Sequence, residues 1–320
     1  MDETRRMKPP TLADALRWAN DPAATDGEKL IAADVLISFG NLDIADALIA
    51  RLARRPEFAG RLNRLMAASR QIRRSGVLTD FKAMTDSGAD VMDGRHEAYT
   101  ARYDGETRKA IIVFTGVDPR IWLSLMMLHM FLKRLNTHVI YLTDHRRLMF
   151  LDGLETVAPG YDGLREALKA TLAELGADEV HVLANSAGGF TGLRCAIELQ
   201  AKSFLGLSIR TDLSEGSPIP VGDFFKRPIL REVAPHLMVD LKPLLQASPW
   251  PERIVLYSGD RNPIDRPHAE HIADLPNVEL NFLPNHNQHD VVSALLIRGD
   301  LEDVLRDFVE GPRPAVARMP

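Results

Sequence analysis

The chain has 320 residues and a net charge of −5, with 39 Lys and Arg against 44 Asp and Glu, and 45% of its residues are hydrophobic. This length suits one large α/β domain with a small additional module. A dedicated nucleic-acid-binding protein is usually basic, so the mildly acidic composition argues against that class. The one cysteine, Cys195, excludes an internal disulfide framework and is typical of a reducing compartment.

No segment of the sequence indicates export or a membrane. Residues 1–10 lack the apolar stretch of a secretory signal peptide. No apolar run approaches the roughly eighteen residues that a membrane-spanning helix needs. We therefore expect a soluble, cytoplasmic protein that does not enter a membrane.

Apolar residues between Thr11 and Gly76 recur every three or four positions, which predicts four amphipathic helices. The second and third, joined by Gly40 and Asn41 and followed by Pro56, resemble a single tetratricopeptide-type hairpin. We assign residues 1–80 to an N-terminal helical segment. It either packs on the rest of the chain as a cap or binds a protein partner.

Strand-like and helix-like patterns alternate along the rest of the chain. Short apolar runs are typical of strands buried on both faces, and predicted helices lie between most of these runs. The expected strands are Lys109–Thr115, His138–Thr143, Val180–Leu183, Phe204–Ile209, Arg253–Tyr257 and Val278–Leu283. The fold class is therefore α/β, with a mostly parallel sheet covered on both faces, in a domain spanning residues 81–310.

Two segments depart from this alternation. Asp104-Gly105 is typical of a tight turn, so we expect Ala98–Tyr103 and Lys109–Thr115 to form a hairpin. Residues 211–250 are rich in proline and interrupt the alternation, which predicts a lid-like insertion over the functional edge of the sheet. Residues 311–320 are expected to be a disordered tail.

The sequence Ala184-Asn185-Ser186-Ala187-Gly188 has the small-x-Ser-x-Gly pattern of a nucleophile elbow. A strand that turns directly into a helix leaves no room for large side chains on either side of the apex, and alanine and glycine satisfy this constraint. The turn would hold Ser186 at a helix N-terminus, where N–H groups favour an oxyanion. The alternative is that Ser186 only caps a helix.

A nucleophilic serine needs a histidine base and an acid that orients the base, and on this fold the chain order is Ser, acid, His. After the strand Arg253–Tyr257 the acid candidates are Asp260 and Asp265, whereas Asn262 cannot carry the required charge. After the strand Val278–Leu283 the base candidates are His286 and His289. We favour His289, because it precedes the closing helix, with His286 as the alternative.

These residues make the chain similar to the α/β-hydrolases from Lys109 to Val309. The resemblance is to a branch with the elbow Ser186-Ala187-Gly188-Gly189, an Asp265-x-x-His268-Ala269 element, and a closing histidine followed by an apolar helix and Gly299. The resemblance implies Asp265 as the acid, with Asp260 as the alternative. It also implies that the N–H groups of Ala187 and Val117 form an oxyanion hole, although the chain has Ala184 in place of glycine and lacks an HGGG-type loop.

Candidate substrate-binding residues are Gly116, Asn185 and Asp144, which end or follow predicted strands at this edge. The charged run from Asp144 to Arg147 could bind a polar or anionic group, or be a solvent loop. The spacings His268-x-x-His271 and His286-x-x-His289 could hold a metal, but no further ligands accompany them. We therefore expect no metal and no cofactor.

The leading hypothesis is a serine hydrolase that cleaves an ester or related acyl bond in a small-molecule or acylated substrate, through a Ser-His-Asp triad and an acyl-enzyme. The same intermediate could serve an acyltransferase. The rival hypothesis is a non-catalytic hydrolase-like domain whose N-terminal helices bind a protein partner.

Overall fold

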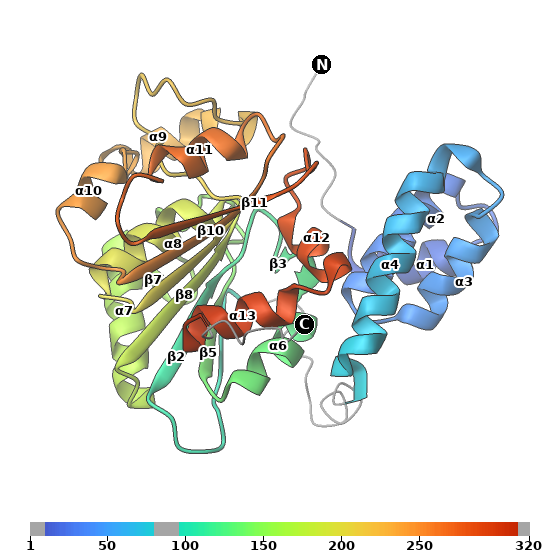
Figure 1. Cartoon of the computed structure of the whole chain (residues 1–320), viewed down its shortest axis with the longest axis horizontal. Helices are drawn as coiled ribbons and strands as arrows, with labels where there is room; N and C mark the ends of the chain where they lie inside the picture. Colours follow the sequence, from blue (N-terminus) through green and yellow to red (C-terminus); the bar gives the residue numbers. More distant parts are fainter. Residues whose placement is uncertain (1–9, 80–95, 313–320) are drawn as a thin grey trace, which may run out of the picture.

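The computed structural model describes residues 10–79 and 96–312, and it is built around a seven-stranded sheet (Figure 1). The strand order is β1-β5-β2-β8-β9-β10-β11. The strand bounds are β1 Ala98–Ala101, β2 Lys109–Phe114, β5 His138–Leu142, β8 Glu179–Asn185, β9 Ser203–Leu207, β10 Arg253–Gly259 and β11 Val278–Leu283. All neighbours pair in parallel except β1, which is antiparallel to β5. The carboxyl ends of the parallel strands therefore meet at one edge.

Alternate side chains of the strands enter two separate hydrophobic cores. In β2, Ile111 and Val113 belong to one core, whereas Ala110, Ile112 and Phe114 belong to the other. Successive side chains of a strand point to opposite faces, so a strand covered on both faces must be apolar throughout. This explains the uninterrupted apolar run of β2.

Helices cover both faces of the sheet, which confirms the predicted fold class. The core nearer the N-terminal segment contains α6 (Leu125–Leu132), α12 (Val291–Arg298) and α13 (Leu301–Glu310). The opposite core contains α7 (Gly160–Leu175), α8 (Gly188–Glu198) and residues of α11 (Asp265–His271). Within residues 10–79 and 96–312, no helix combines the length and the apolar character that crossing a bilayer requires.

The N-terminal segment consists of helices α1–α4, which we call the N-terminal helices. Their bounds are α1 Leu12–Asn20, α2 Asp26–Ser38, α3 Leu42–Leu52 and α4 Ala59–Ser75, with the short 3₁₀ helix η1 at Pro56–Phe58 before α4. Capping boxes start the first two, because Thr11 and Thr25 exchange hydrogen bonds with Asp14 and Glu28. Gly76 ends α4 in the left-handed conformation, at a φ of 70°.

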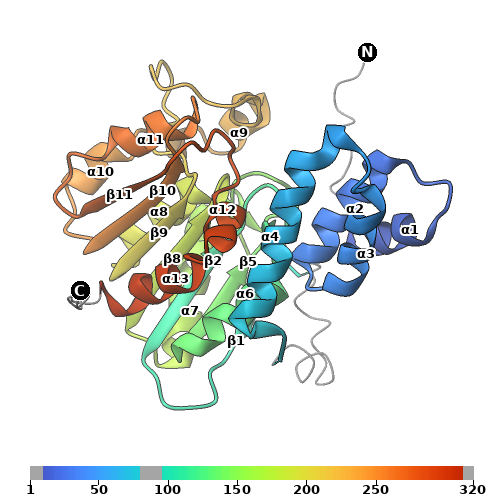
Figure 2. The ribbon, with the colours of Figure 1, turned by 45° about the vertical axis from the view of Figure 1, so that its right-hand side comes forward.

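The N-terminal helices share a hydrophobic core with the sheet domain. Figure 2 shows α4 beside α12. Gln71 Nε2 donates to the Ile297 carbonyl over 3.4 Å, and Arg134 Nη1 donates to the Ser75 carbonyl over 3.0 Å. The N-terminal helices thus pack on the domain as the cap hypothesis expects. The tetratricopeptide-like assignment stays a prediction.

Between β9 and β10 lies the segment predicted as a lid, which we call the lid insertion (residues 211–250). It contains η4 (Asp223–Lys226), α9 (Pro228–Val233), η5 (Pro235–Leu237) and α10 (Lys242–Gln246). A bridge between Asp212 and Asp240 closes it near its two ends. The predicted boundary at residue 80 and most of the predicted tail lie outside the described residues, so the domain limits remain predictions.

The predicted hairpin of residues 98–115 is wrong. Strand β1 pairs with β5, with Tyr99 opposite Tyr141, rather than with β2. Both edges of β2 are already occupied by the parallel strands β5 and β8, so β2 has no free edge for a hairpin partner. Sequence-distant pairing has therefore overridden the local turn signal at Asp104-Gly105.

Short elements complete the fold. Helix α6 begins at Leu125, after β3 (Arg120–Ile121) and β4 (Leu123–Ser124) have paired around Trp122, whose φ is 81°. A second small pair joins β6 (Gly153–Leu154) to β7 (Ala158–Pro159), and η3 (Lys133–Leu135) follows α6.

Candidate active site

Ser186 occupies the turn between β8 and α8, near the centre of the sheet. Its φ is +51°, a conformation that costs a non-glycine residue on the order of 1–3 kcal/mol. Two hydrogen bonds hold the turn: the Ser186 N–H donates to the Leu207 carbonyl over 2.9 Å, and the Gly189 N–H donates to the Ser186 carbonyl over 3.0 Å. The neighbouring strand β9 and the first turn of α8 thereby hold the strained residue in place.

The two glycines after Ala187 are required by close packing of α8 against neighbouring segments. A Cβ on Gly188 would lie 2.2 Å from the Thr115 carbonyl oxygen, and one on Gly189 would lie 2.2 Å from Cγ2 of Ile209. A Cβ atom at either position could be accommodated only if the backbone moved. The Gly188-Gly189 pair therefore allows the helix to begin immediately after the nucleophile candidate.

The departure at Ala184 is compensated within α8. Ala184 is fully buried, and a Cβ added to Gly192 would lie 2.8 Å from its Cβ. The methyl group of Ala184 thus occupies the space that the absent side chain of Gly192 leaves open. In this chain, Gly192 therefore makes room for the alanine at position 184.

Three side chains from separate segments form a continuous hydrogen-bonded chain. His289 Nε2 lies 2.6 Å from Ser186 Oγ, and His289 Nδ1 lies 2.7 Å from Asp265 Oδ2. With the proton on Nδ1 donated to Asp265, Nε2 accepts the hydrogen bond from the Ser186 hydroxyl. The His289 side chain is 44% exposed, so the Ser–His end of the chain faces solvent.

The Asp265 end of the chain is buried and paired with a cation. Asp265 is 1% exposed, and its Oδ1 accepts a hydrogen bond from Arg210 Nη1 over 2.8 Å, at a guanidinium that is itself 5% exposed. Burial acts to raise the pKa of Asp265, but the hydrogen bond and charge of His289, with the charge of Arg210, hold that pKa below its ordinary value. Each carboxylate oxygen therefore has its own cationic or polar partner, and the group stays ionised.

Asn262 shapes the turn that delivers Asp265. Its side-chain oxygen accepts hydrogen bonds from the N–H groups of Ile264 at 3.0 Å and Asp265 at 2.9 Å. Its amide also donates to the Asn287 carbonyl over 3.3 Å. Asn262 thus connects the loop that carries Asp265 to the loop that carries His289.

Sequence reasoning missed Arg210. The available signal was a single arginine placed directly after the apolar run that ends at Ile209, at the edge where the other polar candidates gather. A cation at the end of a buried strand needs a partner, because an isolated buried charge is costly. Its partner, Asp265, is 55 residues further along the chain.

The alternative residues Asp260 and His286 contact each other rather than Ser186. Asp260 Oδ1 accepts a hydrogen bond from the His286 N–H over 2.9 Å, and His286 Nε2 lies 3.0 Å from the Asp290 carbonyl oxygen. Hydrogen bonds from the backbone of Asn285 and His286 lower the pKa of Asp260. This pair organises the loop after β11, in which His289 stands.

Of the two predicted oxyanion donors, Ala187 directly follows the serine in the chain, and Val117 directly follows Gly116. Gly116 lies against the elbow, since a Cβ on it would be 3.2 Å from Asn185 Nδ2 and 3.3 Å from Ser186 Cβ. Among the described residues, the N–H groups of Val117 and Ala187 donate to no backbone or side-chain acceptor. Both N–H groups are thus left for another acceptor.

Asp144 is engaged within its own loop. It is 4% exposed, and its Oδ2 accepts hydrogen bonds from the N–H groups of Leu148 at 2.7 Å and Phe150 at 2.8 Å. Burial raises its pKa, against the effect of these hydrogen bonds. The carboxylate shapes residues 145–150 and does not face an open surface, so we leave it out of the substrate site.

One group in the described part of the chain has the composition of a metal site. Asp212, Asp240 and His271 each offer one ligand atom, and these atoms lie within 4.8 Å of one another. The Asp212 oxygens already accept hydrogen bonds from Ser214 and Ser217, and His271 Nε2 lies 3.4 Å from Asp240 Oδ2. Through these contacts, Asp212 and Asp240 hold the lid insertion together and connect it to His271 of α11. His268, which lies in α11 between Asp265 and His271, is fully buried, and burial lowers its pKa to about 3.

The mostly parallel sheet, the helices on both of its faces and the strained serine turn between a central strand and a helix are those of the α/β-hydrolase fold. No family model matches the chain, and no curated protein matches it in sequence.

Solved structures with a similar arrangement include MenH from S. aureus, at 13% identity and a TM-score of 0.46, covering 68% of this chain and 98% of that one. A carboxylesterase of the thaumarchaeon Nitrososphaera gargenis is 14% identical, with a TM-score of 0.46 and coverage of 67% and 94%. Carboxyl esterase 2 of the fungus Tuber melanosporum is 14% identical, with a TM-score of 0.47 and coverage of 67% and 80%. Because these TM-scores are below 0.5, the fold assignment rests on the strand order and the serine turn.

The contact between Ala184 and Gly192 leads to a stability prediction. Gly192→Ala should lower the free energy of unfolding by about 1–3 kcal/mol, because the new methyl overpacks the site against Ala184. Adding Ala184→Gly should recover at least half of the loss. Urea denaturation of both single variants and the double variant measures this. A neutral Gly192→Ala, or a double variant whose loss equals the sum of the single losses, would contradict the proposed contact.

The buried pair leads to a second prediction. Arg210→Met should lower the free energy of unfolding by about 3–5 kcal/mol, because it leaves the Asp265 carboxylate buried without its cation. Asp265→Asn should also destabilise, and the double variant should lose less than the sum. The coupling should be fully present at pH 7, begin to shrink as the pH falls through the ordinary aspartate pKa of about 4, and be lost only below the lowered pKa that Asp265 has in the folded protein.

A matched control is the surface pair of Arg298 and Asp300, which are 2.8 Å apart but about half exposed. Its double-mutant coupling should be only about 0.2–1 kcal/mol. Equal coupling energies for the two pairs would show that burial does not strengthen the Arg210–Asp265 interaction.

Proposed function

We propose that this protein is a serine hydrolase that cleaves an ester or related acyl bond through Ser186, His289 and Asp265. The observation that carries the proposal is the continuous chain of hydrogen bonds, 2.6 Å from His289 to Ser186 and 2.7 Å from His289 to Asp265. A serine hydroxyl is a weak nucleophile unless a base takes its proton and a third group orients the base. The solvent-facing Ser–His contact is where a substrate carbonyl can approach.

The proposed reaction has two stages. Ser186 Oγ attacks the substrate carbonyl carbon while His289 Nε2 takes the hydroxyl proton, and the carbonyl oxygen becomes an oxyanion. The N–H groups of Ala187 and Val117 donate to this oxyanion. The intermediate then collapses, His289 donates its proton to the leaving oxygen, and the acyl group remains on Ser186. Water, deprotonated by His289, releases the acid and restores the serine.

Asp265 fixes the His289 tautomer and stabilises the imidazolium that forms in each stage. For this it must be ionised, although it is almost fully buried. Arg210 supports the ionised state, since an unpaired buried carboxylate would take up a proton. In this proposal Arg210 acts through Asp265 and is a positioning residue that does not touch the substrate.

Two alternative functions remain. One uses the same three residues, and the other uses none of them. An acyl acceptor other than water would make the protein an acyltransferase through the same acyl-enzyme. A non-catalytic domain whose N-terminal helices bind a partner would need no reactive serine. Reactivity of Ser186 separates the enzymatic hypotheses from the non-catalytic one.

Labelling by a fluorophosphonate probe tests the nucleophile. The full chain should be labelled stoichiometrically, and Ser186→Ala should not be labelled, because the probe reacts with a serine whose hydroxyl is activated by a base. Intact-protein and peptide mass spectrometry measure the adduct and its position. An unlabelled wild-type protein, or equal labelling of the folded Ser186→Ala variant, would refute the proposal.

The choice of acid leads to a separate prediction. Asp265→Asn should slow labelling by about 10³–10⁴-fold, because an amide does not supply the charge that stabilises the imidazolium. Asp260→Asn should label close to the wild-type rate, since Asp260 contacts the His286 backbone instead. Circular dichroism at the labelling temperature confirms that each variant is folded. The opposite order of rates would assign the acid role to Asp260.

A further inference from the structure

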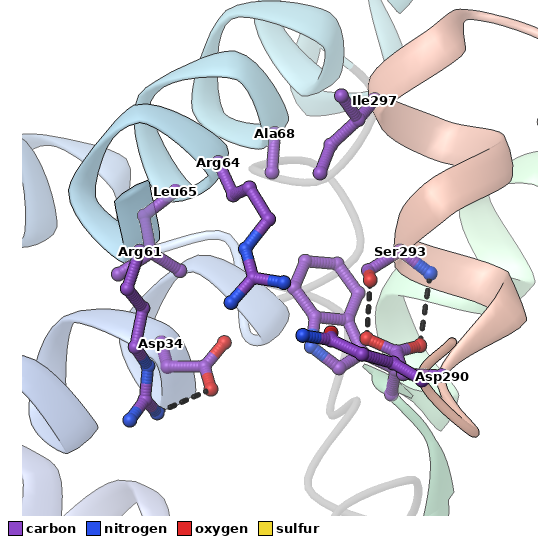
Figure 3. A pocket seen from close by; sticks show the side chains of 10 residues that line it. Asp34, Arg61, Arg64, Leu65, Ala68, Asp290, Ser293 and Ile297 are labelled. Carbon is purple, nitrogen blue, oxygen red and sulfur yellow. Dashed lines mark hydrogen bonds and ion pairs between the residues drawn. The ribbon is translucent and has the colours of Figure 1, made fainter. Parts of the chain in front are cut away.

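A pocket lies where the N-terminal helices meet the sheet domain (Figure 3). Its volume is about 240 Å³, which is enough for a substrate fragment. Residues of α2 and α4 form one wall, and Trp122 with the segment from Gln288 into α12 forms the other. We call it the interhelix pocket. Neither the predicted triad nor the lid insertion contributes a lining residue.

The charged side chains of the interhelix pocket are unequally paired. Asp34 forms an ion pair with Arg61, at 3.2 Å. Asp290 caps α12, accepting hydrogen bonds from the N–H of Ser293 over 3.1 Å and from its hydroxyl. Burial raises the pKa of Asp290, and the nearby charge of Asp34 acts in the same direction. The two carboxylates thus have partners of their own.

Arg64 is the charged residue in this pocket that has no partner. It forms no ion pair and donates no hydrogen bond to another residue within 10–79 and 96–312. Figure 3 shows its side chain extending from α4 into the pocket, between Asp34 and Ser293. A guanidinium offers five N–H donors in a planar fork that matches a carboxylate. Arg64 is exposed and extends into the pocket without a partner, so it can bind an anion there.

Two segments of the sheet domain line the interhelix pocket, and each is close in the sequence to a residue of the candidate active site. Gln288 and Asp290 line it and are the chain neighbours of His289. Adjacent Cα atoms are about 3.8 Å apart, so the pocket wall begins one residue from the proposed base. Trp122 belongs to the segment that follows the proposed oxyanion donor Val117. The interhelix pocket therefore lies beside the loop that carries the proposed base.

We propose that Arg64 binds a carboxylate on the part of the substrate remote from the scissile bond, so that the preferred substrates are esters with a carboxylate-bearing chain. The inference rests on the proposed serine hydrolase function and adds the substrate class. A single negative charge suits the pocket better than a dianion, because the lining holds one unpaired guanidinium together with the carboxylates of Asp34 and Asp290. The N-terminal helices then select the substrate as well as covering the domain.

Matched synthetic esters test this assignment. The probes are 4-nitrophenyl monoesters of linear dicarboxylic acids from succinate to suberate, each compared with the ester in which isopropyl replaces the free carboxylate. Wild-type kcat/KM should be at least about tenfold higher for the carboxylate member at the best chain length, because a charge-assisted hydrogen bond contributes about 1.5–3 kcal/mol. The Ser186→Ala protein gives the background rate of spontaneous hydrolysis.

The variants separate recognition from structure. Arg64→Met should abolish the preference by raising KM for the carboxylate ester, and leave the isopropyl ester unaffected, whereas Arg64→Lys should retain part of the preference. Arg54→Met is the matched control, since Arg54 is also exposed on the N-terminal segment but lies outside the interhelix pocket. It should change neither ester.

The outcomes distinguish this inference from the proposed function. If Ser186 is labelled by the fluorophosphonate but the two ester series are hydrolysed equally, or not at all, the carboxylate site is wrong and the nucleophile stands. An equal loss on both esters in Arg64→Met would also overturn it, by assigning Arg64 a structural role. If Ser186 is not labelled, the proposed function fails and this inference fails with it.

Discussion

The close approach of α8 to the sheet is the constraint on which the candidate site depends. Gly188 must admit the Thr115 carbonyl and Gly189 must admit Ile209, each at a distance that no Cβ could tolerate. Because α8 begins this close to the sheet, the chain between β8 and α8 has to turn sharply, and Ser186 in this turn takes a φ of +51°. The position of the serine hydroxyl thus follows from backbone packing, before any contact with His289 is considered.

Burial of charge governs the other end of the candidate triad. Asp265 and Arg210 are both removed from water, which is favourable only while they remain paired. The ring of Phe225, in the lid insertion, lies 4.9 Å from the Arg210 guanidinium and helps to exclude water from it. The lid insertion therefore shapes the environment of the candidate acid. Substitutions around Phe225 would change the surroundings of the Arg210–Asp265 pair without removing either residue.

Features set by local sequence could be predicted, and features set by distant partners could not. The apolar strands follow from burial on both faces, and the turn at Ser186 follows from small residues at fixed spacing. The shortlist of Asp265 and His289 follows from chain order and family resemblance. Nothing near β1 indicates that it pairs with β5, because the choice depends on which edges β2 leaves free. Arg210 needed a partner 55 residues away, and the interhelix pocket needs α4 and α12, which are far apart in the sequence.

Helix α12 connects the N-terminal helices to the proposed base. Asp290 caps α12 and directly follows His289, so the start of this helix fixes where the imidazole stands. The same helix packs against α4, and Gln71 of α4 hydrogen-bonds the Ile297 carbonyl near the other end of α12. The N-terminal helices therefore contact the helix that begins directly after the proposed base, even though none of their side chains belongs to the hydrogen-bonded chain of Ser186, His289 and Asp265.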